Sequence, residues 1–311
     1  MRALLVVNPK ATATSARERD VLIRALGSDL KVDLEETTHR GHAIELGTRA
    51  VNEAYDLVVV LGGDGTINEV VNGLLGPGEW AGSCADTPAL AVVPGGSTNV
   101  FSRALGISRD PVEATSELLE ALRAERFRQI GMGRVNERWF TFTAGVGLDA
   151  DAVRRVEKAR SKGKRATPSR YTRCAVTSYF ASEKRRAPIT LELPGEEPIV
   201  GVYLAITSNT SPWTYFRSQP VVVAPQCTFE GGLDLVTRDR MGLLPTLWSA
   251  GGMLTGHGLR GRHSRLFHDL AEFTLTLDTP MHLQVDGDYL GMHEEGALRL
   301  RAVPDALRVL A

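Results

Sequence analysis

Apolar, strand-like runs alternate with helix-like segments through the first 130 residues, and this alternation most constrains the fold. The runs Ala3–Val7, Leu57–Leu61 and Ala89–Val93 are continuous, as expected of strands buried on both faces of a sheet. Helical patterns of about 10–15 residues lie between such runs in βαβ units, whose crossovers are right-handed. The sequence therefore predicts a parallel sheet covered by helices. We expect helices over 15–26, 43–54 and 111–125, helices beginning at Thr66 and near Thr98, and a further strand over 29–35.

The pattern changes near residue 130, where short β-rich runs separated by turn residues replace the alternation. Helical periodicity persists only in a basic segment and around 241–254. This predicts an antiparallel β-sandwich or barrel. We expect an α/β domain over 1–130 and a β-sandwich domain over 131–299, with 300–311 able to pack back on the first. The expected β-rich runs are Trp139–Thr143, Ile199–Thr207, Val221–Val223, Leu233–Val236, Phe273–Leu277, His282–Val285 and Ala297–Arg301.

Composition excludes several classes of protein. Apolar residues make up 43% and charged residues 23% of the 311 residues, which is ordinary for a globular protein and not for a disordered or collagen-like chain. No apolar run approaches the roughly 18 residues of a membrane span. The three cysteines form no CxxC pair, so we expect neither a disulfide framework nor a cysteine zinc site, and a cytoplasmic setting.

Three loops follow strands of the predicted sheet directly, at Asn8, Gly62 and Pro94, and must share its carboxyl edge, where α/β folds bind ligands. Gly62-Gly63-Asp64-Gly65-Thr66 is the most informative. A glycine turn leading into a helix presents free N–H groups to phosphate. Thr66 could cap that helix, with Glu69 completing a capping box. Asp64 could bind magnesium or accept a proton from a hydroxyl, or the segment could be a plain tight turn.

The loop Pro94–Asn99 repeats this composition one strand later, with two glycines, two hydroxyls and an amide before a helix. It is either a second phosphate-binding wall or a plain helix entry. Asn8 and Lys10 would form a third wall, with Lys10 as a phosphate cation. Arg103 is another candidate cation or a solvated surface residue. No GxxxxGK[ST] sequence occurs, which excludes a P-loop.

The motifs taken together resemble the diacylglycerol kinase/sphingosine kinase family of lipid kinases, and the bacterial soluble diacylglycerol kinases in particular. The resemblance spans nearly the whole chain, in the family's order. It is carried by Asn8-Pro9, Thr37 before Gly41-His42-Ala43, Gly62–Val70, Pro94–Asn99, Gly145–Ala150 and Gln284-Val285-Asp286-Gly287-Asp288.

This resemblance implies an ATP-dependent kinase with a nucleotide-binding α/β domain and a β-sandwich domain, using Mg²⁺ and making phosphatidic acid from diacylglycerol. The proton acceptor would be Asp288, where the family has Glu in a DGE turn, with Asp64 as a competing base or metal-network residue. The ATP site would comprise Asn8, Pro9, Lys10, Ala11, Thr12, Thr37, Gly62, Gly63, Asp64, Gly65, Thr66, Ile67, Asn68 and Thr98.

The resemblance also implies a structural magnesium ion in the loop from Pro225 to Asp234. Its ligands would be the backbone carbonyls of Cys227 and Gly232 and the side chain of Glu230. Two positions that are often Asp in the family are Val100 and Gly131 here. Both changes remove a carboxylate from the acidic network expected around magnesium.

Residues 151–190 carry 12 Lys or Arg and three acids, a local charge of +9, although the whole chain has a net charge of −1. Such a block suits peripheral docking to an anionic membrane, at about 1 kcal/mol per basic residue. The alternative is a solvated charged helix whose aromatic residues pack into the protein core. No nucleic-acid motif accompanies the block, so we expect no nucleic-acid partner. The oligomeric state stays open, with a homodimer as one option. Aromatic residues that could enter the interface are Tyr171, Tyr179 and Phe180 in the block, and Trp213, Tyr215 and Phe216 elsewhere.

Two rival functions stay open at this point. One is a kinase of the same superfamily acting on NAD or a sphingoid base. The other is a nucleotide- or lipid-binding regulator that has lost catalysis, which the residues at positions 100, 131 and 288 favour.

Overall fold

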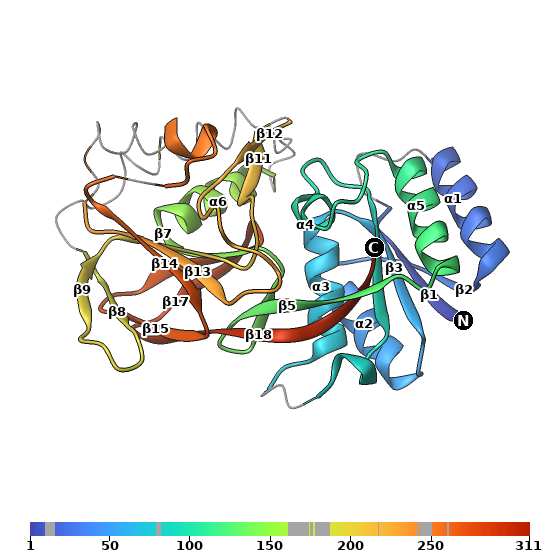
Figure 1. Cartoon of the computed structure of the whole chain (residues 1–311), viewed down its shortest axis with the longest axis horizontal. Helices are drawn as coiled ribbons and strands as arrows, with labels where there is room; N and C mark the ends of the chain where they lie inside the picture. Colours follow the sequence, from blue (N-terminus) through green and yellow to red (C-terminus); the bar gives the residue numbers. More distant parts are fainter. Residues whose placement is uncertain are drawn as a thin grey trace. The chain divides into compact units, whose positions relative to one another are not determined.

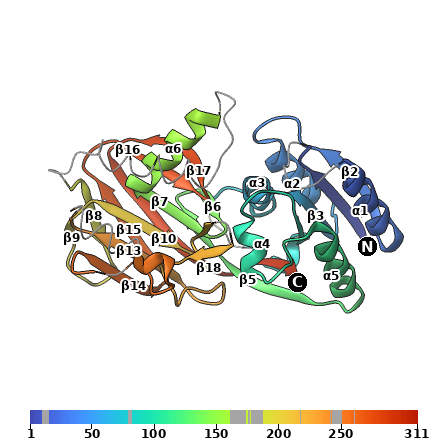
Figure 2. The same ribbon diagram turned by 90° about the horizontal axis from the view of Figure 1, so that it is seen from above.

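The computed structural model describes residues 1–9, 16–78, 82–160, 174, 177, 187–216, 218–240, 242, 251–259 and 261–311. The chain divides into two compact units, whose helices and strands are labelled in Figure 1 and Figure 2. The first unit comprises Met1–Met132, Glu137–Trp139 and Val303–Ala311. The second comprises Gly133–Asn136 and Phe140–Ala302.

The first unit is built on a parallel sheet with the strand order β2-β1-β3-β4. Every residue of β3 and β4 is buried, as their continuous apolar sequences predict. The last strand of the chain, β18, also reaches this sheet, where Val309 pairs in parallel with Leu90 of β4. The strand bounds are β1 Arg2–Val7, β2 Lys31–Glu36, β3 Leu57–Gly62, β4 Ala89–Pro94 and β18 Gly296–Leu310.

Helices cover both faces of this sheet. Leu22 of α1 and Leu118 of α5 pack in one core cluster with Leu5 of β1 and Val59 of β3. The other two long helices, α2 and α3, contact β1 and β3 and pack closely on each other. Gly73 permits that packing, because a Cβ there would lie 2.2 Å from the Ile44 carbonyl oxygen. The bounds are α1 Ala16–Asp29, α2 His42–Asn52, α3 Asp64–Leu75, α4 Val100–Ala104, α5 Pro111–Arg123 and a 3₁₀ turn at Cys84–Asp86.

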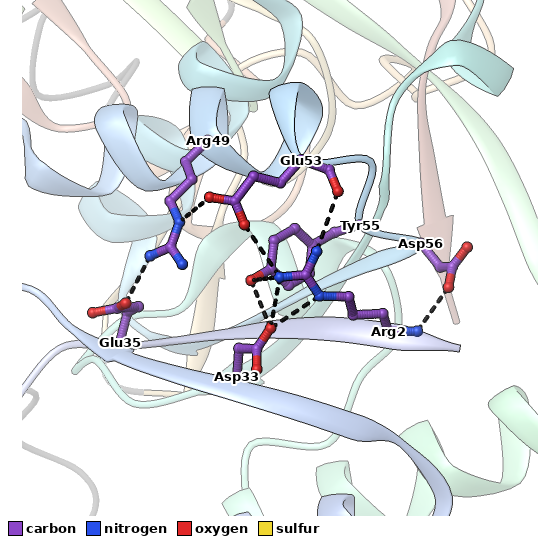
Figure 3. A network of polar contacts seen from close by, with 7 residues as sticks. All are labelled: Arg2, Asp33, Glu35, Arg49, Glu53, Tyr55 and Asp56. Atoms are coloured by element: carbon purple, nitrogen blue, oxygen red, sulfur yellow. Dashed lines mark hydrogen bonds and ion pairs between the residues drawn. The ribbon is translucent and has the colours of Figure 1, made fainter.

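A polar network, which we call the Arg2 network, lies toward the amino end of the sheet (Figure 3). The Arg2 guanidinium donates to Asp33 at 3.0 Å, Glu53 at 3.1 Å and the Tyr55 hydroxyl at 2.8 Å. The backbone N–H of Arg2 donates to Asp56 at 2.7 Å. The network thereby links β1, β2, the end of α2 and the start of β3. Arg49 extends it, with 2.7 Å bonds to Glu53 and to Glu35.

The second unit contains two antiparallel sheets packed face to face. Val146 and Leu235 of one sheet share a core cluster with Phe140, Leu191 and Leu275 of the other. One sheet has the order β14-β13-β10-β7-β16-β17, and the other continues from β18 through β15 and β8 to β9. The strand bounds are β7 Thr143–Gly147, β8 Ile189–Glu192, β9 Ile199–Val202, β10 Leu204–Ser208, β13 Leu233–Arg238, β14 Ser264–Leu270, β15 Glu272–Leu277, β16 Met281–Val285 and β17 Asp288–His293.

Helix α6 (Leu148–Arg160) contacts β7, β16 and β17 of the first of these sheets. Leu148 also packs in a smaller cluster that includes Ile206, Val236 and Trp213. The remaining elements are β5 Phe127–Val135, β6 Arg138–Phe140 and the hairpin β11 Thr214–Phe216 with β12 Gln219–Val221.

This architecture confirms the predicted fold class, a parallel α/β region followed by an antiparallel β-sandwich. The expected β-run Val221–Val223 is wrong in its bounds, because β12 ends at Val221. Trp213 packs in the smaller cluster, whereas Phe216 is 40% exposed. No helix in the described part of the chain is long and apolar enough to cross a bilayer. Outside the described residues lie Lys10, Ala11, Thr12, Tyr171, Tyr179, Phe180, most of the basic block and most of the helix expected over 241–254.

Candidate functional site

The loops at the carboxyl ends of the four parallel strands are tied to one another by their backbones. The Thr37 N–H donates to the Val7 carbonyl at 2.8 Å, and the Asn8 N–H donates to the Leu61 carbonyl at 3.0 Å. The Gly95 N–H donates to the Gly62 carbonyl at 2.8 Å. The four loops therefore form one continuous edge, as the parallel arrangement predicts. We call it the carboxyl rim.

Two glycines of the carboxyl rim approach each other so closely that side chains are excluded. A Cβ on Gly96 would lie 2.8 Å from the Gly63 Cα, and a Cβ on Gly63 would lie 3.2 Å from the Gly96 Cα. Gly63 is also the N-cap of α3, and no side chain caps that helix. Helix α3 therefore begins where the two glycine loops approach most closely, and a helix N-terminus in such a place suits phosphate oxygens.

Asn99 holds the Pro94–Asn99 loop in shape. Its side chain accepts from the Gly96 N–H and donates to the Gly96 carbonyl, both at 2.9 Å. Asn99 has a left-handed backbone, with φ of 50°, at the N-cap of α4. The amide is therefore occupied within its own loop, whereas Ser97 is exposed and Thr98 is half-buried at the rim.

Asp64 connects the two glycine loops. It is the first residue of α3, and its Oδ1 accepts from the backbone N–H of Phe101 in α4 at 3.1 Å. This bond fixes the carboxylate at the rim between the third and fourth loops. The same bond gives the Phe101 N–H an acceptor, which N–H groups in the first turn of a helix do not find within the helix itself.

The capping box predicted for α3 is wrong. The helix begins at Asp64, two residues before Thr66, and Gly63 is its N-cap. The Thr66 hydroxyl accepts instead from the Asn8 side chain at 3.0 Å, which joins the first and third loops. Glu69 reaches across to the second loop, where it accepts from the Gly41 N–H at 2.9 Å. Both side chains therefore hold neighbouring loops together.

The last two residues assigned to the glycine loop point into the first unit. Ile67 is fully buried, and Asn68 is 2% exposed. The Asn68 amide donates to the Trp139 carbonyl at 3.0 Å, and its oxygen accepts from Arg138 at 2.5 Å. Asn68 thus links α3 to β6. The contacts with Arg138 and Trp139 were missed from the sequence, because no local signal connects positions so far apart.

Asp288 belongs to the second unit, where it is the first residue of β17 and half-buried. It pairs with Val285 across a two-residue turn, Asp286-Gly287. Both turn residues have positive φ, 50° and 78°, as a type I′ hairpin requires. The Gln284 side chain supports the turn by accepting from the Gly287 N–H at 2.9 Å.

Gln284 also donates to Asp149 at 2.7 Å, in the first turn of α6. Burial raises the pKa of Asp149 to about 6, and the hydrogen bond from Gln284 opposes that rise. Asp149 carries no role in the predictions from the sequence, although it lies within the Gly145–Ala150 motif.

The loop proposed to hold a structural cation lies beside a buried carboxylate. Asp234 is fully buried; its Oδ1 accepts from His268 at 2.7 Å and from the Asp269 N–H at 3.1 Å. Among the described residues, its buried Oδ2 has no hydrogen-bond partner. Burial, followed by the negative charge of Asp234, raises the pKa of the Cys227 thiol, which donates to the Ser208 carbonyl. This negative surrounding fits a cation, although the described residues contain no cluster of three His, Cys, Asp or Glu.

The comparisons with known proteins agree with the fold and with the motifs. Residues 2–135 match the family described as diacylglycerol kinase catalytic domain. A diacylglycerol kinase from Bacillus subtilis (strain 168) is 28% identical over 306 residues, covering 94% of this chain and 91% of that protein. A diacylglycerol kinase from Staphylococcus aureus (strain bovine RF122 / ET3-1) is 32% identical over 152 residues, only 44% of its length.

The crystal structure of a diacylglycerol kinase from Bacillus anthracis str. Sterne has the same fold. It superimposes with a TM-score of 0.73 over 99% of this chain and 96% of that one, at 20% sequence identity. The similarity therefore covers both units. The expected resemblance is confirmed, because residues 2–135 match the model of the diacylglycerol kinase catalytic domain family.

Proposed function

We propose that this protein transfers the γ-phosphate of ATP to the primary hydroxyl of diacylglycerol, giving phosphatidic acid and ADP. The carboxyl rim carries the proposal, because it brings four loops with glycines, hydroxyls and the N-terminus of α3 to one edge. The similarity to the Bacillus subtilis diacylglycerol kinase over most of both chains supports the choice of lipid.

The rim would bind the triphosphate mainly through backbone groups. The N–H groups at the start of α3 face the close approach of Gly63 and Gly96, and Asn8 and Thr66 hold the first loop beside them. Thr37 and Thr98 add hydroxyls at the ends of the rim. Positioning and charge stabilisation provide most of the catalysis in phosphoryl transfer, so rigid backbone donors are suitable for it.

In the proposed reaction, Asp288 accepts the proton of the lipid hydroxyl. The hydroxyl oxygen then forms its bond to the γ-phosphorus, and the bond to the bridging oxygen breaks with its electron pair leaving on ADP. Asp64 is the competing acceptor. Its bond to the Phe101 N–H favours a positioning role at the rim.

Bound magnesium would neutralise charge on the phosphates and on the leaving group. Asp64 is the carboxylate at the rim that would hold this ion, and one or two carboxylates with substrate phosphates suffice for Mg²⁺. Residues 100 and 131 are Val and Gly and supply no further carboxylate. A second, structural ion would be held by the carbonyls of Cys227 and Gly232 and by Glu230. This site is favoured by the buried Oδ2 of Asp234, which has no hydrogen-bond partner within the described ranges.

The lipid must be reached at a membrane surface, and we include peripheral docking to an anionic bilayer in the proposal. The charge of +9 over 151–190 supports it. Phe216, 40% exposed on β11, is an apolar side chain that could enter the interface. Sedimentation with anionic and neutral vesicles at low salt tests this part, and equal binding to both would contradict electrostatic docking.

A phosphorylation assay with labelled ATP, magnesium and a panel of alcohols tests the proposed reaction. The panel contains diacylglycerol, a sphingoid base and NAD. Label in phosphatidic acid, strictly dependent on added diacylglycerol, is expected. Label in NAD or in the sphingoid base would indicate another kinase of the superfamily. Nucleotide binding without transfer to any alcohol would indicate a regulator.

A further inference from the structure

We propose that Asp286 is a positioning residue for the proposed proton acceptor, Asp288. This inference rests on the proposed function. Asp286 lies two residues before Asp288, in the turn between β16 and β17. It is 5% exposed, so its carboxylate is directed into the second unit.

The Asp286 carboxylate receives four hydrogen bonds from one short segment. Oδ2 accepts from the Thr141 N–H at 2.7 Å and from the Thr141 hydroxyl at 2.8 Å. Oδ1 accepts from the Phe142 N–H at 2.9 Å and the Thr143 N–H at 3.0 Å. The Asp286 N–H donates to the Thr143 carbonyl at 2.9 Å. Five bonds therefore fix the turn against the start of β7.

The opposite side of the turn is held by Gln284, which is 1% exposed. Its oxygen accepts from the Gly287 N–H, and its nitrogen donates to Asp149 of α6. The turn is therefore held from both sides, by β7 and by the first turn of α6. Asp288 follows immediately, so its backbone position depends on both contacts.

Two chemical arguments assign the function of this arrangement to positioning. A hairpin turn of Asp and Gly at positive φ needs no tertiary hydrogen bonds to form, yet this one has five to Thr141–Thr143, a segment far away in sequence that leads into the neighbouring strand β7. A carboxylate is also costly to bury unless its acceptors are satisfied. A misplacement of a reacting group by about 1 Å can lower a rate on the order of a hundredfold. The bonds of Asp286 limit such displacement of Asp288.

The test measures kcat, the KM for ATP and thermal unfolding for the full chain and its variants. Asp286→Asn replaces one accepting oxygen by an amide that cannot accept. We expect kcat on diacylglycerol to fall on the order of tenfold to a hundredfold, with the KM for ATP unchanged because the carboxyl rim is not altered. A fall of kcat with an altered KM for ATP would overturn the proposal, as would an unchanged kcat.

A double-mutant cycle gives the decisive readout. If Asp286 acts through Asp288, the combination of Asp286→Asn and Asp288→Asn is no slower than Asp288→Asn alone, because the positioned group is already gone. Multiplied effects would show a general structural role and overturn the proposal. A wild-type chain inactive on every alcohol would contradict the proposed function, and this inference with it; an active wild type with an unaffected Asp286→Asn would overturn the inference alone.

Thr141→Val covers the case in which Asp286→Asn does not fold. It removes the hydroxyl bond to Asp286 and leaves the three backbone donors in place. We expect kcat to fall about twofold to tenfold, the effect of one hydrogen bond, and this fall also to vanish in the Asp288→Asn background. Thr143→Val is the matched control, because its hydroxyl bonds to the Thr207 carbonyl and not to Asp286. Equal losses in the two threonine variants would overturn the proposal.

Discussion

The two ends of the parallel sheet in the first unit are held together in different ways. Toward the amino end, the Arg2 network joins strands through charged side chains that are partly exposed (Figure 3). At the carboxyl rim, neighbouring loops are joined by backbone hydrogen bonds, by the contact of Gly63 with Gly96, and by single side-chain bonds of Thr66, Glu69 and Asp64. The approach of Gly63 and Gly96 keeps bulky side chains out of that part of the rim, whereas charged side chains connect the strands at the amino end. We therefore propose ligand binding at the carboxyl rim and a stabilising role for the Arg2 network.

The largest expected effect is at the carboxyl rim. Asp64→Ala should lower kcat at least about a hundredfold, the low end for loss of an acid–base group, and it also removes the acceptor of the Phe101 N–H. Steady-state kinetics at saturating ATP measure it. Asp110→Ala is the matched control, because it removes an Asp that caps α5 through Val112 and Glu113. Similar kinetics for the two variants would show that Asp64 acts only as a cap.

Gly96→Ala should weaken ATP binding at least about tenfold, because the new methyl group meets the Gly63 backbone and opens the rim. Equilibrium titration with ATP measures the Kd. Gly27→Ala is the control: a Cβ there meets nothing within 4 Å in α1, and the change should stabilise the helix by up to about 1 kcal/mol. Unchanged ATP affinity in Gly96→Ala would contradict the role of the rim.

Buried and exposed carboxylates should respond to pH in opposite directions. Asp149 has a pKa raised to about 6 in the folded protein, above its value of about 3.9 when unfolded. The folded state therefore holds the proton longer, and its contribution to stability falls as pH rises from about 4 to about 6, by up to about 3 kcal/mol.

Asp149→Asn keeps an acceptor for Gln284 and removes this titration. Urea unfolding at several pH values between 4.5 and 7 should show the variant gaining stability relative to wild type as pH rises. A stability difference that does not vary with pH would contradict the raised pKa.

The smallest effect is expected at the amino end. Arg2→Ala should lower Tm by about 1–3 °C, since partly exposed ion pairs stabilise little, and it should leave kcat and the KM for ATP unchanged. Hydrogen bonds from Tyr55 and then Arg2 lower the pKa of Asp33, and bonds from Arg49 and Arg2 lower that of Glu53. The two ionised carboxylates stabilise the folded state above the ordinary carboxyl pKa, and this stabilisation is lost as the pH falls. On acidification below about pH 4, the Tm of Arg2→Ala should therefore fall less than the Tm of the wild type. A loss of kinase activity in Arg2→Ala would contradict the proposal that the Arg2 network contributes to stability and not to ligand binding.

Much of the rim could be predicted from the sequence, because three continuous apolar runs dictate a parallel sheet and therefore place the loops after them on one edge. The side chains were harder. Thr66 and Glu69 fit a local capping box, yet they bond to Asn8 and Gly41 from neighbouring loops. Asn68 bonds to Trp139, 71 residues later. Local spacing cannot reveal partners that the tertiary structure brings together.

The second unit gives the same lesson. The Gln284–Asp288 turn could be identified from its composition, but the donors to Asp286 lie 143 to 145 residues earlier. The two further residues that support this turn are Thr141, just before β7, and Asp149 of α6, and no local spacing links either of them to it. They follow from burial, because a buried carboxylate must find donors.

Amide hydrogen exchange of the full chain, with and without ATP and magnesium, tests the central claim most directly. We predict slower exchange on nucleotide addition at Gly62–Thr66 and Gly95–Asn99, and no change at Tyr55–Asp56 beside the Arg2 network. Protection confined to segments outside the carboxyl rim would contradict the account.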